Sequence, residues 1–110
     1  MEFSEKVVLI TGSASGFGRT LAYEFAKKGA SLILSDVNER DGQAVADEIT
    51  ANGGKVTFAK CDVSNTEHVK QMVEAGVAAF GKLDICINNA GIAGNAKILP
   101  LAVTSWSDLE

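Results

Sequence analysis

Three glycines stand among small residues in the segment Thr11–Gly18, which reads Thr-Gly-Ser-Ala-Ser-Gly-Phe-Gly. The aliphatic segment Lys6–Thr11 leads into them and is typical of a buried strand, whereas Gly16–Lys28 has the apolar spacing of an amphipathic helix. Glycines at such a junction let the chain turn sharply and let the backbone approach a pyrophosphate without a Cβ in the way. The helix N-terminus then directs unpaired N–H groups at the phosphates. The segment therefore predicts a dinucleotide-binding turn, and the alternative is a tight turn without a ligand.

A carboxylate follows the second predicted strand, about 20 residues beyond the glycine turn. This strand, Leu32–Leu34, ends at Ser35 and Asp36. A carboxylate at this place can accept hydrogen bonds from both hydroxyls of an adenosine ribose, and it repels the 2′-phosphate that distinguishes NADP from NAD. Asp36 therefore predicts NAD as the cofactor. The alternatives for this residue are a solvated loop aspartate and a helix cap.

The rest of the sequence repeats the alternation of strand and helix that positions these residues. Asn38 is a candidate N-cap for a second helix, and Ser64–Glu67 is a capping box for a third helix whose apolar stripe covers Val69–Phe80. Two further strands are predicted at Val56–Cys61 and Leu83–Ile87. Helical crossovers make the sheet parallel, and their right-handedness places the four strands in the order 3-2-1-4. The predicted fold class is α/β, a truncated doubly wound fold of Rossmann type with helices on both faces of the sheet.

The composition is that of a soluble globular protein, 46% hydrophobic and 22% charged. A chain of 110 residues is expected to form the N-terminal part of a single dinucleotide-binding domain. The net charge of −4 argues against nucleic-acid binding. The apolar run Val7–Ile10 is too short for a signal peptide or a membrane span, so we expect a cytoplasmic protein without membrane contact. Cys61 and Cys86 are then expected to be reduced core thiols rather than a disulfide. His68 is the only histidine and no zinc-ligand spacing occurs, so we predict no metal site.

The sequence resembles the classical short-chain dehydrogenase/reductase family in three motifs. The Thr-Gly-x-x-x-Gly-x-Gly turn of that family is matched by Thr11–Gly18, its Asp-Val after the third strand by Asp62–Val63, and its Asn-Asn-Ala-Gly by Asn88–Gly91. The resemblance implies that the first motif binds the pyrophosphate and adenosine ribose, that the second holds the adenine, and that the third passes beneath the cofactor. The predicted cofactor-binding residues are Gly12, Ser13, Ser15, Gly16, Phe17, Gly18, Asp36, Val37, Asp62, Val63, Asn89, Ala90 and Gly91.

The resemblance also bears on the choice between the two nicotinamide cofactors. Members that prefer NADP carry a basic residue before the second glycine of the turn or just after strand 2. This chain has Ser15 and Val37 at those places, which agrees with NAD. For Asp62, a role in cofactor binding and a structural role are equally consistent with the sequence, because its side chain could instead close an Asx turn.

No catalytic residue is assigned to this chain. Tyr23 and Lys27 match the spacing of the family's Tyr-x-x-x-Lys pair, but a helical projection places both away from the sheet and from the cofactor edge. The resemblance places the family's Ser, Tyr and Lys after a fifth strand, beyond Glu110. A helix Asn that joins them usually follows a Trp such as Trp106. We therefore expect the NAD-binding half of an oxidoreductase for an alcohol or ketone substrate, inactive by itself. The alternatives are a non-catalytic NAD-binding or interaction module and one piece of a split enzyme.

The last residues of the chain lose the alternating pattern. Periodicity fades from Ile92, Pro100 interrupts the chain, and Thr104–Glu110 has the features of a helix start. With nothing predicted beside it, the strand Leu83–Ile87 would expose a row of unpaired N–H and C=O groups. We therefore expect the isolated chain to self-associate through this strand.

Overall fold

The computed structural model describes residues 2–89 and the backbone of residues 97–103. Strands and helices alternate along the chain up to the fourth strand, as the sequence predicts, and a fifth strand is the next element after it. The elements are β1 (Val7–Thr11), α1 (Gly16–Lys27), β2 (Ser31–Asp36), α2 (Glu39–Ala51), β3 (Lys55–Lys60), α3 (Thr66–Phe80), β4 (Leu83–Asn88) and β5 (Lys97–Val103).

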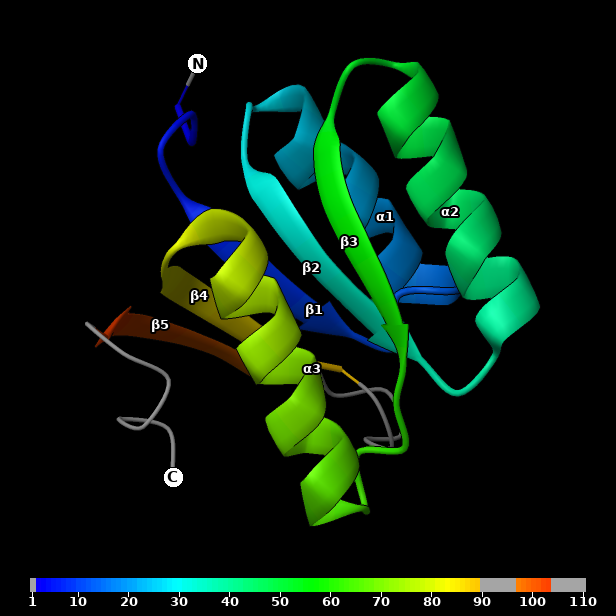
Figure 1. Cartoon of the computed structure of the whole chain (residues 1–110). Coiled ribbons are helices and arrows are strands. Elements are labelled where there is room, and N and C mark those ends of the chain that lie inside the picture. Colours follow the sequence, from blue (N-terminus) through cyan, green and yellow to red (C-terminus); the bar gives the residue numbers. More distant parts are fainter. Residues whose placement is uncertain (1, 90–96, 104–110) are drawn as a thin grey trace.

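The strands form one sheet in the order β3-β2-β1-β4-β5, in which β1 to β4 are parallel. Helices α1 and α2 cover one face of this sheet and α3 covers the other (Figure 1). The predicted Rossmann-type α/β fold, with the strand order 3-2-1-4 and helices on both faces, is confirmed. No helix within the described residues is long and apolar enough to cross a membrane.

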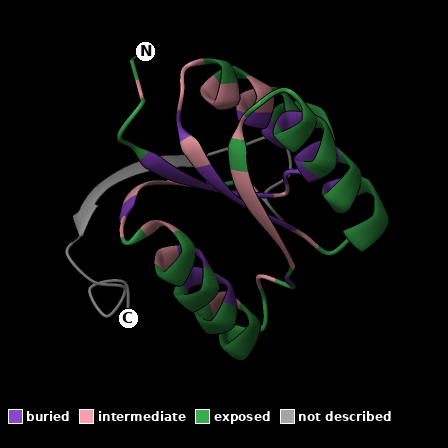
Figure 2. Ribbon diagram, turned by 45° about the horizontal axis from the view of Figure 1, so that its top comes forward, coloured by how far each residue is buried: buried purple, intermediate pink, exposed green. Residues whose placement is uncertain are grey.

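One apolar layer lies on each face of the sheet. This explains why the sequences of the central strands are uninterrupted aliphatic runs. Val8 and Ile10 of β1 pack with α1 and α2, whereas Val7 and Leu9 pack with α3. All five residues of β1 are buried, because both faces of a parallel sheet are covered. Figure 2 shows the same division in the helices, whose buried residues face the sheet and whose exposed residues face outward.

The end of the chain departs from the sequence prediction. Residues 97–103 form a strand that pairs antiparallel with β4, with Cys86 opposite Leu99 and Ile87 opposite Ile98. Pro100 lies within it, beside a register shift, and an edge strand tolerates a proline because its outer side needs no ladder hydrogen bond. The prediction that β4 has an unpaired edge is therefore wrong, and self-association through that edge loses its structural basis. The helix start predicted at Thr104–Glu110 lies outside the described residues.

Two local predictions are also corrected. The N-cap of α3 is Asn65, whose side chain accepts from the His68 N–H at 3.2 Å, because the predicted cap, Ser64, donates its hydroxyl to Asp62 instead. Phe17 falls within Gly16–Lys28, the segment whose apolar spacing predicts an amphipathic helix packed on the sheet, yet it is 55% exposed. It lies in the first turn of α1, whose buried residues are Gly18 and Ala22. The predicted cap of α2, Asn38, is confirmed and accepts from the Asp41 N–H at 3.0 Å.

Candidate functional site

The C-terminal ends of three neighbouring strands meet at one edge of the sheet. Thr11 at the end of β1 is paired with Ser35 of β2 on one side and with Asn88 of β4 on the other. The segments that follow these strands therefore come together, although they are far apart in the sequence. Together with the segment after β3, they enclose a pocket of about 400 Å³ lined by Gly12, Ser15, Asp36, Val37, Cys61, Asp62, Val63 and Asn89.

Seven of these eight lining residues belong to the predicted cofactor-binding set. The eighth, Cys61, was predicted to be a core thiol; it is 2% exposed and still borders the pocket. The sequence feature that could have identified Cys61 is its position at the end of the predicted third strand, directly before Asp62. Of the other predicted residues, Ala90 and Gly91 lie outside the described residues.

The glycine turn depends on two different properties of glycine. Gly12 and Gly16 have φ values of 68° and 58°, a region that other L-residues rarely adopt. Gly18 is needed for space, because a Cβ there would overlap the carbonyl of Gly12 and crowd the side-chain amide of Asn89. The predicted close packing of the helix on the strand at Gly18 is thus explained by the backbone of the preceding turn.

The N-terminus of α1 differs from those of the other two described helices. Asn38 and Asn65 cap α2 and α3 with their side chains, and the first turns of both helices contain acidic residues. The N-cap of α1, Ser15, makes no side-chain capping bond, and no acidic residue lies in the first turn. The first N–H groups of α1 are consequently left for a partner outside the helix, and the positive end of the helix dipole favours an anion.

Asp36 lies across the turn from this helix start. Its Oδ2 accepts from the Ala14 N–H at 3.0 Å, and its Oδ1 accepts from the Asn38 N–H at 2.9 Å. The next residue, Val37, is 61% exposed at the rim of the pocket. Ser13 does not line the pocket: it is fully buried, and both its N–H and its hydroxyl donate to the Ser35 carbonyl.

A polar network ties the end of β4 to the end of β1. The Thr11 hydroxyl donates to Asn88 Oδ1 and accepts from the Asn89 N–H, both at 3.0 Å. The Asn89 side chain donates to the Gly12 carbonyl at 3.2 Å. These bonds fix the pocket floor, since Gly12 and Asn89 both line it.

The loop after β3 forms the remaining wall. Asp62 Oδ1 accepts from both the N–H and the hydroxyl of Ser64, at 2.9 and 2.6 Å, and these bonds lower the pKa of the Asp62 carboxyl. The Asx turn considered for Asp62 is therefore present. The Asp62 N–H donates to His68 Nδ1 at 3.3 Å, so the exposed His68 also supports this loop.

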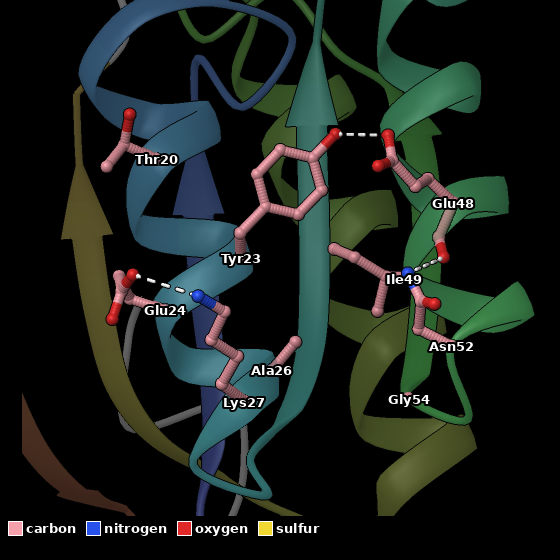
Figure 3. Close-up of a pocket in the computed structure, with 9 residues that line it drawn as sticks. All are labelled: Thr20, Tyr23, Glu24, Ala26, Lys27, Glu48, Ile49, Asn52 and Gly54. Atoms are coloured by element: carbon pink, nitrogen blue, oxygen red, sulfur yellow. Dashed lines mark hydrogen bonds and ion pairs between the residues drawn. The ribbon is translucent and has the colours of Figure 1, made fainter.

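The Tyr23-x-x-x-Lys27 motif lies elsewhere. It lines a larger pocket of about 590 Å³ between α1 and α2, which shares no residue with the pocket at the strand ends (Figure 3). The Tyr23 hydroxyl donates to Glu48 at 2.8 Å, and Lys27 pairs with Glu24 at 3.7 Å (Figure 3). Burial and the adjacent Glu48 carboxylate raise the pKa of Tyr23, which is opposite to what a tyrosine acting as a base requires. Tyr23 is half-buried because α2 covers this side of α1.

The strand order and the glycine turn at the strand ends define a Rossmann-type α/β protein. The sequence model of the short chain dehydrogenase family matches residues 6–109, and the chain belongs to this short-chain dehydrogenase/reductase family. Within the described residues, no group of three or more metal-ligating side chains is close enough together to hold a metal ion.

Similar proteins are dehydrogenases that are considerably longer than this chain. A 3beta-hydroxysteroid dehydrogenase of Mediterraneibacter gnavus is 45% identical over 95 residues, covering 86% of this chain and 34% of that protein. A cyclohexanol dehydrogenase of Acinetobacter sp. is 41% identical, covering 96% of this chain and 42% of that protein. The chain thus spans between a third and a half of the length of these two relatives.

Two solved structures share the fold. A short-chain dehydrogenase/reductase from Burkholderia phymatum, crystallised in complex with NAD, has a TM-score of 0.75 and 40% identity, covering 78% of this chain and 31% of that one. A hydroxysteroid dehydrogenase from Escherichia coli has a TM-score of 0.76 and 36% identity, covering 81% of this chain and 38% of that one.

Proposed function

We propose that the pocket at the strand ends binds NAD. The observation that carries this proposal is that the uncapped start of α1 and the carboxylate of Asp36 lie at the same pocket. The pyrophosphate would bind at the N–H groups of α1, and the adenosine ribose at Asp36. The adenine would lie against Val37, Val63 and Asp62, which line the far wall.

The charges around the pocket support NAD over NADP. Its lining residues include two carboxylates, Asp36 and Asp62, and no lysine or arginine. A 2′-phosphate on the ribose would face Asp36 without a cation to neutralise it, because the two places where relatives of NADP type carry a basic residue hold Ser15 and Val37. The preference for NAD over NADP therefore rests on repulsion between Asp36 and the 2′-phosphate as well as on attraction between Asp36 and the ribose hydroxyls.

The protein that contains this chain is proposed to oxidise an alcohol or reduce a carbonyl compound. The relatives named above act on hydroxyl-bearing molecules, a steroid and cyclohexanol. When bound, the cofactor would accept the hydride in an oxidation or, in its reduced form, donate it in a reduction, and the residues of this chain would hold it in place. We propose that the 110 residues do not turn over substrate by themselves, because the one tyrosine of the chain is bonded to Glu48, outside the site.

Calorimetric titration of the chain with NAD and with NADP tests the cofactor proposal. We expect NAD to bind more tightly than NADP, by at least about tenfold, as one lost charge-assisted hydrogen bond implies. Arg19→Ala serves as a control for nonspecific attraction of phosphate, because Arg19 is exposed on α1 and does not line the pocket. Equal or tighter binding of NADP would contradict the proposal.

A further inference from the structure

The carboxylate of Asp36 is held by two backbone N–H groups, one bonded to each of its oxygens. The Ala14 N–H belongs to the glycine turn, and the Asn38 N–H belongs to the loop that enters α2. Asn38 is also the side-chain cap of α2. Asp36 therefore links the turn after β1 to the start of α2.

The end of β2 holds two successive residues of the glycine turn. The Ser35 carbonyl accepts from the N–H and the hydroxyl of Ser13, at 3.1 and 3.2 Å, and Asp36 accepts from the next N–H. Ser13 is fully buried and Ala14 is 5% exposed, so neither N–H is available to a bound anion. The N–H groups left for a phosphate belong to the start of α1, and its place relative to β2 depends on how residues 13 and 14 are held.

The two roles of Asp36 do not compete for the same lone pairs. A carboxylate has about four acceptor positions, and the backbone bonds use one on each oxygen. Each oxygen keeps a further position, which is enough for the two hydroxyls of a ribose. We propose that Asp36 is a positioning residue for the phosphate-binding turn, in addition to the ribose contact that the proposed function assigns to it. The affinity for the pyrophosphate and the preference between cofactors are then coupled through one side chain.

Amide hydrogen exchange without ligand tests the positioning role directly. In Asp36→Ala, we expect the Ala14 N–H to exchange about tenfold faster or more, since a charge-assisted bond has been removed. The matched control is Asp47→Ala, which removes the same charge from α2, where Asp47 bonds only to Gln43 among the bonds described. Unchanged exchange at residue 14 in Asp36→Ala would overturn the proposal.

A second variant keeps the proposal testable if Asp36→Ala does not fold. Asp36→Asn keeps the size of the side chain but presents an NH₂ group to one of the two backbone donors. We expect faster exchange at residue 14 or residue 38 in this variant, confined to the two loops. Acceleration throughout the sheet would identify a general loss of stability and would overturn the local role.

A pair of nucleotides separates positioning from direct contact. ADP has both ribose hydroxyls, and 2′,3′-dideoxyadenosine diphosphate has neither. If Asp36 also positions the turn, Asp36→Ala weakens binding of the dideoxy nucleotide by about threefold or more, although removal of a negative charge by itself favours a diphosphate. Unchanged or tighter binding of the dideoxy nucleotide in Asp36→Ala would overturn the proposal. If the wild-type chain binds neither nucleotide, the proposed function fails, whereas the exchange experiment still decides the role of Asp36 in the turn.

Discussion

Replacing Gly18 by alanine inserts one methyl group between α1 and the turn that follows β1. The new Cβ would overlap the carbonyl of Gly12, a backbone atom that cannot rotate away, and would crowd the side-chain amide of Asn89. Relief requires α1 to move outward from the sheet. Overpacking of this kind costs about 1–3 kcal/mol, and alanine recovers up to about 1 kcal/mol through its helix propensity. We expect Gly18→Ala to lower the free energy of unfolding by about 1–2 kcal/mol.

Gly53→Ala is the matched control for this substitution. Gly53 has a φ of 89° and no heavy atom within 4 Å of a built Cβ, so the substitution adds backbone strain without overlap. That strain costs about 1–2 kcal/mol, close to the loss expected at Gly18. Gly53 lies in the loop between α2 and β3, away from the pocket at the strand ends. The two variants should therefore lose similar amounts of unfolding free energy, but only Gly18→Ala should weaken the binding of NAD.

Urea denaturation followed by circular dichroism measures the stability of both variants, and calorimetry measures NAD binding. NMR of the Asn89 side-chain amide provides a reading that does not depend on the ligand. We expect its resonances to shift in Gly18→Ala and to stay in place in Gly53→Ala. If Gly18→Ala unfolds at the same urea concentration as the parent and leaves the Asn89 resonances unchanged, the close approach of Gly18 to the Gly12 carbonyl is refuted.

Three further predictions follow from other positions. Burial opposes ionisation of Asp84, but the bond from the Val7 N–H and the adjacent Lys82 outweigh it and lower the pKa of the carboxyl. Asp84→Asn should therefore cost about 1–2 kcal/mol at pH 7, and the difference from wild type in urea denaturation should disappear as the pH falls below about 3.9 and through the lowered pKa. The single tyrosine should ionise above its ordinary pKa of 10.0 in an ultraviolet titration and return toward it in Glu48→Gln; an unchanged midpoint would contradict the Tyr23–Glu48 bond. Gly16→Val should unfold about 1–2 kcal/mol more easily because of its φ of 58° and should lose NAD binding in calorimetry, whereas binding equal to the parent would place the phosphates elsewhere.

The features that the sequence could predict are those set by local chemistry along the chain. Buried aliphatic runs separated by amphipathic helices determine the parallel strand order, and that order places the ends of β1, β2 and β4 side by side. This is why Gly12, Asp36 and Asn89 could be assigned to one site although they are distant in the sequence. Their positions follow from where each strand ends.

The features that the sequence could not predict depend on contacts between elements. The Tyr23–Glu48 bond joins α1 to α2. The apolar spacing within each helix predicts which face packs on the sheet, but it does not predict which side chains of the two helices meet. The bond from the Ala14 N–H to Asp36 requires the turn and the strand end to be in place already. The strand at residues 97–103 was not predicted because it contains a proline and because it pairs antiparallel with β4, outside the parallel alternation of strand and helix.

The placement of β1 between β2 and β4 has a consequence for synthesis of the protein. Its partner β2 follows after only one helix, whereas the contacts that reach β4, such as the Val7 N–H to Asp84 and Asn89 to Thr11, span 77 and 78 residues. During synthesis, β1, α1, β2, α2 and β3 can associate before β4 has emerged from the ribosome, because the chain emerges from its N-terminus and segments close in sequence associate first. The nascent chain then exposes the β1 edge of the sheet until β4 arrives. The floor of the pocket at the strand ends closes only at that step, so a nascent chain whose β4 has not yet emerged from the ribosome should already have secondary structure but should lack the proposed nucleotide site.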